Sequence, residues 1–360
     1  MKVGIFSFPN SVSYGCMLQM YALQRAVEQM GHEAEAINYQ NAYMKQERHV
    51  ARLAGKPSMK DKARKMARKV LHRKMYRAFA NFEKQHIGLY PEKVFGDRQT
   101  LCRVGRRYDA IICGSDQVWN PDITGQDLAY FLDFCEENTR RVAYAPSFGI
   151  EDFSEAFCRE IQPELKQFSA LSVREASGQA LVEELTGRDV PIVADPTFFL
   201  EQSDWEKLEQ EHPAAKGEYI LYFTVRSSRS LWEKALEFSR KSGMKLVVIG
   251  GSMLKKRVDG VEYAVDIGPG QWLYLIHHAR YVVTNSFHGT AFSIHFRRDF
   301  YLDLSARTNS RLEHIARILG LEDRIVKGPL EPSTADYTVA EQVLPEMRQA
   351  SWDYLKQALE

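Results

Sequence analysis

Strand-like and helix-like segments alternate twice along this chain, with a break between residues 196 and 216. Alternation of this kind is typical of parallel sheets that carry helices on both faces. The chain has 360 residues, which is more than one hydrophobic core usually fills, so two domains are expected. The sequence therefore predicts an α/β protein with two Rossmann-like domains facing a cleft.

The first run predicts an N-terminal domain over residues 1–200, and the second a C-terminal domain over residues 201–335. In the first, strands are expected at 3–8, 34–39, 110–113, 141–145, 171–173 and 191–194, and helices at 16–30, 153–168 and 175–185. In the second, strands are expected at 219–225, 245–249, 281–283 and 300–302, and helices at 203–210, 230–242, 269–279 and 310–319. Residues 336–360 are expected to form a helix that packs back on the N-terminal domain.

A basic helical insertion is expected at about 45–85. Residues 45–77 hold 13 Lys and Arg against two acidic residues, while the whole chain has a net charge of only +1. Apolar residues recur in this block at mostly three- and four-residue spacings, which predicts an amphipathic helix with a basic outer face. Two interpretations remain open: contact with an anionic membrane or a lipid-linked substrate, or a solvated surface helix. Nucleic acid is not an expected partner, because the block has no base-reading motif and the rest of the chain is acidic.

The composition favours a soluble, cytoplasmic protein without a cofactor. No secretory signal is recognisable at the N-terminus, and no apolar stretch approaches the roughly 20 residues that a bilayer span needs. Five cysteines form no CxxC pair, as expected in a reducing compartment. No histidine belongs to a carboxylate-rich sequence cluster, so no metal site is predicted.

Three polar loops follow expected strands, at residues 7–14, 114–120 and 284–293. Ligands of open parallel sheets bind beyond the carboxyl ends of the strands. The stretch TNSFHGTAFS at 284–293 places His288 at the start of an expected helix beginning near Gly289. Helix-start N–H groups favour an anion, and an imidazole titrates near neutral pH. Ser286, Thr290 and Ser293 can cap or line this helix start, and Gly289 would let a ligand approach. The motif therefore indicates either an anion site with an acid–base histidine or a capped turn.

Two arginines also follow expected strands, Arg174 in LSVREASG and Arg311 in NSR, where Asn309 precedes it. A guanidinium at such a position can bind a carboxylate or phosphate through two parallel hydrogen bonds. A surface pair with a neighbouring glutamate at Arg174, or an exposed arginine on a capped helix at Arg311, explains the pattern equally well.

The loop GSDQVWN at 114–120 combines residues that sugar sites favour. An exposed ring of Trp119 would stack on a sugar, while Ser115, Asp116 and Asn120 would bind its hydroxyls; a structural turn with a core tryptophan is an equal alternative. The segment SVSYGCMLQ contributes Tyr14, Gly15 and Gln19, which either face the ligand or form an ordinary helix entry.

The ordered set of motifs resembles the polysaccharide pyruvyl transferase family over nearly the whole chain. The matching segments are SVSYGCMLQMYALQRAVEQMGHEAEAINY, YDAIICGSDQVWNP, VAYAPSFG, LSVREASG, VADPTFFL, TNSFHGTAFSIHF and NSRLEHIARILGLEDR. The resemblance implies a GT-B-like pair of Rossmann-type domains, an N-terminal acceptor side and a C-terminal donor side. It also implies transfer of a pyruvyl group from phosphoenolpyruvate to sugar hydroxyls of a cell-surface polysaccharide or its lipid-linked precursor.

The resemblance also implies roles for individual residues. Arg174 is similar to the family arginine that binds the donor, and His288 to the histidine that acts as acid–base or binds the donor phosphate. The best-known members carry an arginine two positions before that histidine, where this chain has Ser286. Loss of one charged hydrogen bond to the donor would cost about 1.5–3 kcal/mol, and Arg311 is a candidate replacement. A nucleotide-sugar glycosyltransferase of GT-B type and a non-catalytic glycan-binding relative remain the alternatives.

Overall fold

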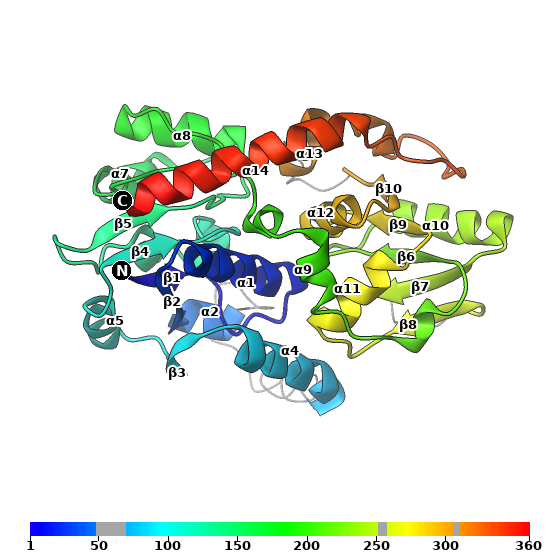
Figure 1. The fold of residues 1–360 in the computed structure, drawn as a ribbon, viewed down its shortest axis with the longest axis horizontal. Coiled ribbons are helices and arrows are strands. Elements are labelled where there is room, and N and C mark those ends of the chain that lie inside the picture. The colour runs from blue at the N-terminus through cyan, green and yellow to red at the C-terminus, as the bar shows by residue number, and fades with distance from the viewer. Residues whose placement is uncertain (48–69, 251–257, 305–309) are drawn as a thin grey trace. The chain divides into compact units, whose positions relative to one another are not determined.

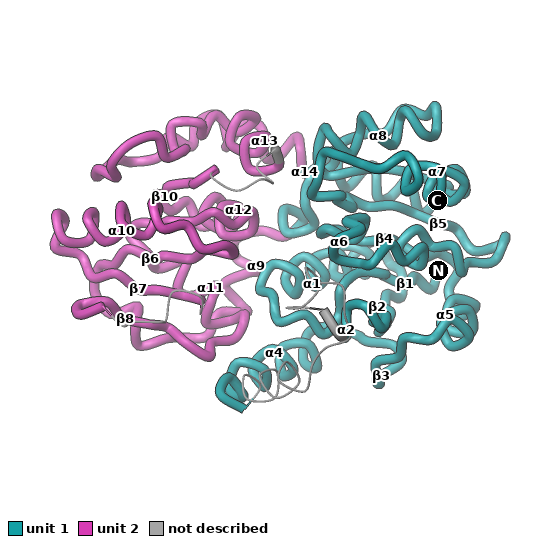
Figure 2. The backbone as a smooth tube through the Cα atoms, turned by 180° about the vertical axis from the view of Figure 1, so that it is seen from behind, with its two compact units in different colours: residues 1–199, 348–360 teal, residues 200–347 magenta. Residues whose placement is uncertain are grey.

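The computed structural model describes residues 1–47, 70–250, 258–304 and 310–360 (Figure 1). These residues form two compact units (Figure 2). Unit 1 comprises Met1–Phe199 and Arg348–Glu360, and unit 2 comprises Leu200–Met347. Each unit contains a five-stranded parallel sheet with helices. The predicted α/β class with two Rossmann-like folds is confirmed.

The sheet of unit 1 has the strand order β3-β2-β1-β4-β5, and every neighbouring pair is parallel. Its strands are β1 (Lys2–Phe6), β2 (Glu33–Tyr39), β3 (Leu89–Phe95), β4 (Ala110–Cys113) and β5 (Arg140–Ala143). Its helices of eight or more residues are α1 (Tyr14–Gln29), α4 (Arg73–His86), α5 (Arg98–Gly105), α7 (Glu155–Lys166) and α8 (Ala176–Thr186), followed by the end of α14 (Thr338–Leu359). The strands expected at 171–173 and 191–194 are present only as isolated bridges, Val142 to Ala170 and Val173 to Ile192.

Two hydrophobic clusters lie among the described residues of unit 1. One includes Trp119, Phe131 and Phe148, whereas the other includes Val3 and Ile5 of β1 with Leu355 of α14. The helix α14 begins within unit 2, but its residues from Arg348 onward belong to unit 1. The hydroxyl of Ser351, on α14, accepts a hydrogen bond from the Ala194 N–H at 2.9 Å. Burial of its apolar side chains therefore makes the C-terminus of the chain part of the core of unit 1.

The sheet of unit 2 has the strand order β10-β9-β6-β7-β8, again with parallel neighbours. Its strands are β6 (Tyr219–Phe223), β7 (Lys245–Ile249), β8 (Val261–Ala264), β9 (Tyr281–Thr284) and β10 (Asp299–Leu302). Its helices are α9 (Gln202–Glu206), α10 (Arg229–Ser242), α11 (Pro269–His277), α12 (Phe287–His295), α13 (Ser310–Ile318) and the start of α14. Because β6, β9 and β10 are neighbours and parallel, the loops after them leave the sheet at the same edge.

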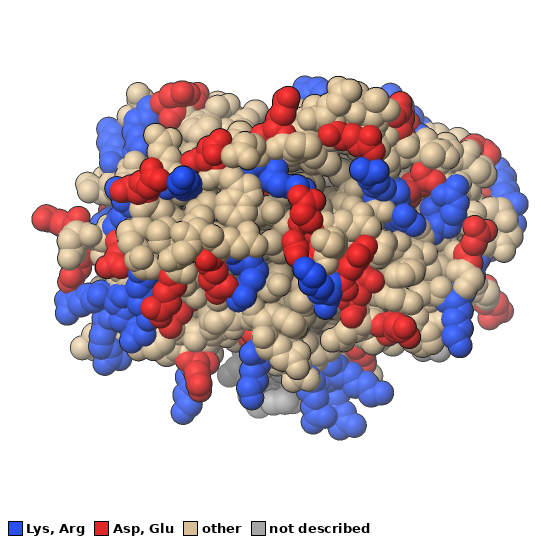
Figure 3. Space-filling model, viewed as in Figure 1, with Lys and Arg blue, Asp and Glu red and all other residues tan. Residues whose placement is uncertain are grey.

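Most of the basic insertion expected at 45–85 lies outside the described residues, namely 48–69. The helices α2 (Ala42–Glu47) and α4 flank it. Phe79 and Phe82 of α4 are buried, whereas Val70 and Leu71, just before α4, are 64% and 72% exposed. Figure 3 shows lysine and arginine side chains gathered over α4 at the lower edge of the view. Among helices of the described ranges, none combines the length and the apolar character that crossing a membrane requires.

Candidate functional site

His288 lies in the first turn of α12, directly beyond the carboxyl end of β9. The helix begins at Phe287, two residues earlier than the start expected near Gly289. Ser286 is the N-cap: its backbone is extended, and its Oγ accepts a hydrogen bond from the Gly289 N–H at 3.2 Å. The half-buried imidazole ring meets the ring of Phe287 edge-on, with 5.3 Å between centroids. The motif thus combines a capped helix start with a partly accessible histidine.

The hydroxyl groups of this motif differ in what they do. The Oγ1 of Thr290 donates to the carbonyl of Ser286 at 3.1 Å, and the Oγ of Ser293 donates to the carbonyl of Gly289 at 2.7 Å. Both bonds run to the residue four positions earlier, which a hydroxyl inside a helix reaches readily. The expectation that Thr290 and Ser293 cap the helix-start donors is therefore wrong, and Ser286 is the residue that does so.

Gly289 permits close packing of α12 on β9. A Cβ at this position would lie 2.5 Å from the Oγ1 of Thr284 and 3.2 Å from the ring of Phe223. The Thr284 hydroxyl also accepts a hydrogen bond from the Ser286 N–H at 3.0 Å. The glycine makes room for a strand residue, and the close ligand approach expected at Gly289 stays a prediction.

Asn285 is a site residue that the sequence reasoning missed. Its Oδ1 accepts from the Val225 N–H at 3.0 Å, and its Nδ2 donates to the carbonyl of Arg226 at 2.8 Å. These two bonds hold the loop after β6 against the start of α12. The exposed Arg226 consequently stands beside the His288 loop. The polar run TNS between a strand and a helix was the sequence feature that could have pointed to Asn285.

Arg311 lies in the first turn of α13 and is half-buried. The helix follows β10, which pairs with β9, so Arg311 and His288 begin helices that come after neighbouring strands. Asn309, the other residue expected here, lies outside the described residues. Unit 2 therefore brings His288, Ser286, Gly289 and Thr290 together and places Arg226 and Arg311 at the same edge of the sheet.

Arg174 belongs to unit 1 and is almost fully buried. Its Nη1 lies 2.8 Å from the Oδ2 of Asp195 and 3.3 Å from the Oγ of Ser115. Burial opposes the charge of the guanidinium, but Asp195, Asp116 and Glu175 together favour it, and the pKa of Arg174 is raised. The alternative of a surface pair with the neighbouring glutamate is wrong in its location: Arg174 is buried, its nearest partner is Asp195, and Glu175 lies within the same buried cluster at 4.0 Å.

A buried polar network continues from this pair to the carboxyl end of β1. The Ser115 Oγ donates to Asp195 at 3.1 Å, and the Ser115 carbonyl accepts from the Ser7 Oγ at 3.1 Å. The Ser7 Oγ in turn accepts from the Nε2 of Gln19 on α1 at 3.1 Å. Gln19 is fully buried, as is Ser115. The network joins three of the residues expected in the site: Gln19, Ser115 and Arg174.

Two residues of the 114–120 loop have structural roles. Trp119 is fully buried, stacks on Phe131 with 5.2 Å between centroids, and donates from Nε1 to the carbonyl of Tyr130. Asn120 caps the short helix α6 (Pro121–Thr124): its Oδ1 accepts from the Asp122 N–H and its Nδ2 donates to Gln117. The sugar contacts expected of Trp119 and Asn120 are therefore wrong, because burial and capping use these side chains.

Asp116 differs from Trp119 and Asn120 in being only half-buried. It is half-buried and adopts a positive φ of 82°, which is uncommon for a residue with a side chain. Its Oδ2 accepts from the Cys16 thiol at 2.5 Å, and its Oδ1 from the Gln117 N–H at 2.8 Å. Cys16 lies in the first turn of α1, which Tyr14 and Gly15 begin. Tyr14 is half-buried and packs on Phe79 of α4 with 5.1 Å between centroids.

Comparison with known structures supports the fold. The chain is similar to a Listeria monocytogenes protein described as a UDP-N-acetylglucosamine 2-epimerase, with a TM-score of 0.54, 11% identity and coverage of 99% of this chain and 90% of that chain. It is also similar to UDP-GlcNAc 2-epimerase from Neisseria meningitidis bound to UDP-GlcNAc, with a TM-score of 0.50, 12% identity and coverage of 99% and 94%. At such identities the likeness concerns the fold alone, which is GT-B-like.

Comparison of the sequence is more specific. No curated protein matches the chain. The family model of the polysaccharide pyruvyl transferases matches residues 14–301, which include α1, the buried Arg174–Asp195 pair and the His288 motif. The match covers well over half of the 360 residues. The chain therefore belongs to the polysaccharide pyruvyl transferase family.

Proposed function

We propose that this protein transfers the pyruvyl group of phosphoenolpyruvate to two hydroxyls of a sugar in a cell-surface polysaccharide or its lipid-linked precursor. The proposal rests chiefly on one observation: a half-buried histidine in the first turn of a helix that follows a central parallel strand. Helix-start N–H groups favour an anion, and an imidazole can act as a general acid or base. Phosphoenolpyruvate offers both an anion and a carbon that needs a proton.

The chemistry is balanced without a cofactor. Protonation of the methylene carbon of the donor makes its C2 electrophilic, and one sugar hydroxyl adds there while losing its proton. Phosphate leaves C2 with the electron pair of the C–O bond, and the second hydroxyl adds to C2, giving its proton to the departing phosphate, to close a cyclic ketal. The products are the ketal and inorganic phosphate. His288 is proposed to carry the proton to the donor, a role that general acid catalysis by imidazole fits.

Phosphoenolpyruvate is an anion, so its binding also needs positively charged side chains. In place of the family arginine, this chain has Ser286, whose hydroxyl caps α12. We infer that Arg226 or Arg311 supplies the missing charge, because both follow strands that neighbour β9 in the sheet. Arg174 is proposed as the second donor residue, with Asp195 holding its guanidinium in place. For the acceptor, Tyr14, Gly15 and Asp116 remain the proposed contacts at the carboxyl edge of unit 1.

A peripheral contact with an anionic surface is proposed for α4. Arg73, Lys74 and Arg77 of this helix are exposed, and the exposed apolar side chains of Val70 and Leu71 precede them. Cations beside exposed apolar side chains are typical of segments that lie in a membrane interface. A lipid-linked acceptor would be presented at such a surface.

The decisive experiment is a donor and acceptor screen with purified protein. We expect phosphate release from phosphoenolpyruvate only when a suitable lipid-linked or nitrophenyl sugar is present, together with a product whose mass matches the ketal. A His288→Asn variant serves as the control. Turnover of UDP-sugars instead would point to a glycosyltransferase, and glycan binding without any turnover to a non-catalytic relative.

A further inference from the structure

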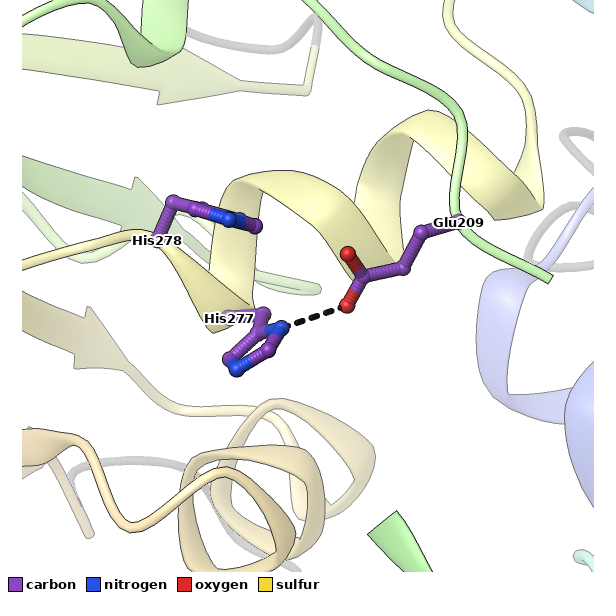
Figure 4. A group of neighbouring side chains, drawn as sticks. All are labelled: Glu209, His277 and His278. Carbon is purple, nitrogen blue, oxygen red and sulfur yellow. Dashed lines mark hydrogen bonds and ion pairs between the residues drawn. The ribbon is translucent and has the colours of Figure 1, made fainter. Parts of the chain in front are cut away.

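We propose that Glu209, His277 and His278 form a binding site for a divalent transition-metal ion such as Zn²⁺. The three side chains offer one carboxylate oxygen and two imidazole nitrogens, all within 4.8 Å of one another (Figure 4). All three lie in unit 2: the two histidines at the end of α11, and Glu209 in the turn after α9. This site is separate from the reaction proposed above.

The ring of His277 is held in a fixed orientation. Its Nδ1 lies 2.7 Å from the Oε1 of Glu209, and its ring stacks on Phe296 at 4.4 Å between centroids with an angle of 16°. The two atoms share a hydrogen, and a bound metal ion would replace that hydrogen between Nδ1 of His277 and Oε1 of Glu209. The second ring nitrogen, Nε2, lies 3.8 Å from a carboxylate oxygen of Glu206. This separation exceeds a hydrogen bond, so the ring owes its orientation to Glu209 and Phe296.

His278 offers its outer nitrogen. Its Nδ1 lies 2.9 Å from the carbonyl of Tyr274, and in the neutral tautomer that donates to this carbonyl the lone pair is on Nε2. The ring also stacks on Tyr274 with 4.0 Å between centroids. His278 is exposed, whereas His277 and Glu209 are mostly buried, with side chains 19% and 11% exposed. An ion would thus reach the cluster from solvent and meet two ligands that are already positioned.

The backbone around Glu209 is held close to α11. The Gln210 N–H donates to the carbonyl of Gly270 at 3.1 Å, and a Cβ at Gly270 would lie 2.5 Å from the carbonyl of Leu208. The segment that carries the carboxylate therefore packs directly on the helix that carries the histidines. In a tetrahedral site with metal–ligand distances of about 2.1 Å, ligand atoms lie roughly 3.4 Å apart, which falls between the 2.7 Å of the His277–Glu209 contact and the 4.8 Å span of the cluster.

The ligand set decides the class of ion. Two imidazoles with one carboxylate suit Zn²⁺ and its transition-metal neighbours, whereas Mg²⁺ and Ca²⁺ take oxygen ligands. Three protein ligands leave a fourth position for water. The site is distant from His288: Phe296, which supports His277, follows the other end of α12, about 12 Å along the helix axis. The ion would link α11 to the α9 turn.

The test is a Zn²⁺ titration of the full chain, free of any histidine tag, by calorimetry. We expect one Zn²⁺ ion per chain, and at least tenfold weaker binding in both His278→Ala and Glu209→Gln. The first change removes an exposed side chain, and the second keeps the carbonyl oxygen that faces His277, so both variants should fold. His32→Ala, a partly exposed histidine of unit 1, is the matched control and should bind as the unaltered chain does.

Cobalt supplies a second measurement, because the five cysteines are competing ligands for transition metals. With Co²⁺ at the proposed site, the absorption spectrum should show nitrogen and oxygen ligation and no thiolate charge-transfer band. Absence of stoichiometric binding, a thiolate band, or unchanged affinity in His278→Ala and Glu209→Gln would each overturn the proposal.

Discussion

Arg174 and Asp195 form a buried ion pair in which Nη1 and Oδ2 lie 2.8 Å apart and the side chains are 2% and 0% exposed. The other carboxylate oxygen of Asp195 accepts from the N–H and the hydroxyl of Thr197. Removing one partner of such a pair leaves an uncompensated charge in the core. We expect Asp195→Asn to lower the free energy of unfolding by about 3–5 kcal/mol, measured by urea denaturation. The exposed pair of Arg106 and Glu136 is the control, since Glu136→Gln should cost at most about 1 kcal/mol.

Arg174 also tests the donor site. Arg174→Lys keeps a cation near Asp195 but removes the planar fork that binds a carboxylate or phosphate with two hydrogen bonds. We expect this variant to remain folded and to bind phosphoenolpyruvate at least tenfold more weakly by calorimetry. Unaltered affinity in a folded Arg174→Lys protein would show that the arginine serves the core of unit 1 and takes no part in donor binding.

His288→Asn tests the acid–base role. Asparagine is similar in size and polarity but cannot exchange a proton, so turnover should fall about 100-fold or more. The melting temperature should change little, because the side chain is only half-buried and the helix cap is made by Ser286. Normal turnover in the variant would reduce the motif to a capped turn.

The sequence was most informative where periodicity reports burial. The central strands β1, β4, β6, β7 and β9 are apolar runs, and their burial on both faces makes them easy to recognise. The edge strands β3 and β8 were not predicted, because these two are largely open to solvent and carry charges such as Lys93 and Glu262, unlike the buried edge strand β10.

Side-chain roles were harder to predict because they depend on partners far along the chain. Trp119 sits in a polar loop and was interpreted as exposed, yet Phe131 and Phe148 bury it. The nearest carboxylate partner of Arg174 is Asp195, 21 residues away at 2.8 Å, whereas the adjacent Glu175 lies at 4.0 Å. Glu209 and His277 are 68 residues apart, so local spacing contained no sign of their contact.

Arg226 and Arg311 are the candidate replacements for the missing family arginine. We expect alanine at one of the two positions to raise the KM for phosphoenolpyruvate about 10- to 100-fold, as the loss of a charged hydrogen bond predicts. The value of kcat should change less than that of KM, because the cation contacts the donor equally in the bound complex and in the transition state. Arg229→Ala, which removes an exposed cation paired with Glu233 on α10, is the control. An unchanged KM in both single variants and in the double variant would exclude both residues.

Helix α4 should contribute to membrane binding. Changing Arg73, Lys74 and Arg77 to glutamine should weaken co-sedimentation with vesicles that contain anionic lipid, and added salt should weaken binding of the unaltered chain. A triple glutamine variant at Arg103, Arg106 and Arg107, in and after α5, is the matched control. Co-sedimentation that depends on neither salt nor anionic lipid would favour the solvated-helix interpretation.

Glu83 predicts a pH dependence of stability. Burial raises the pKa of this carboxyl above its ordinary value near 4.5, although the Asn10 N–H donates to its Oε1 at 2.8 Å and partly opposes the shift. The folded state therefore favours the protonated form, whereas the unfolded chain ionises at the ordinary value. The protonated carboxyl therefore stabilises the fold below the unfolded-state pKa. This contribution to the free energy of unfolding is lost as the pH rises through the folded-state pKa, by about 1.4 kcal/mol per pH unit while unfolding releases one proton.

A Glu83→Gln variant stays neutral and keeps the oxygen that accepts from Asn10. We expect its melting temperature to exceed that of the unaltered chain at pH 7.5 and the difference to shrink toward pH 4.5, measured by differential scanning fluorimetry. A variant that is less stable at both pH values would show that the ionised carboxylate is the form that the fold prefers.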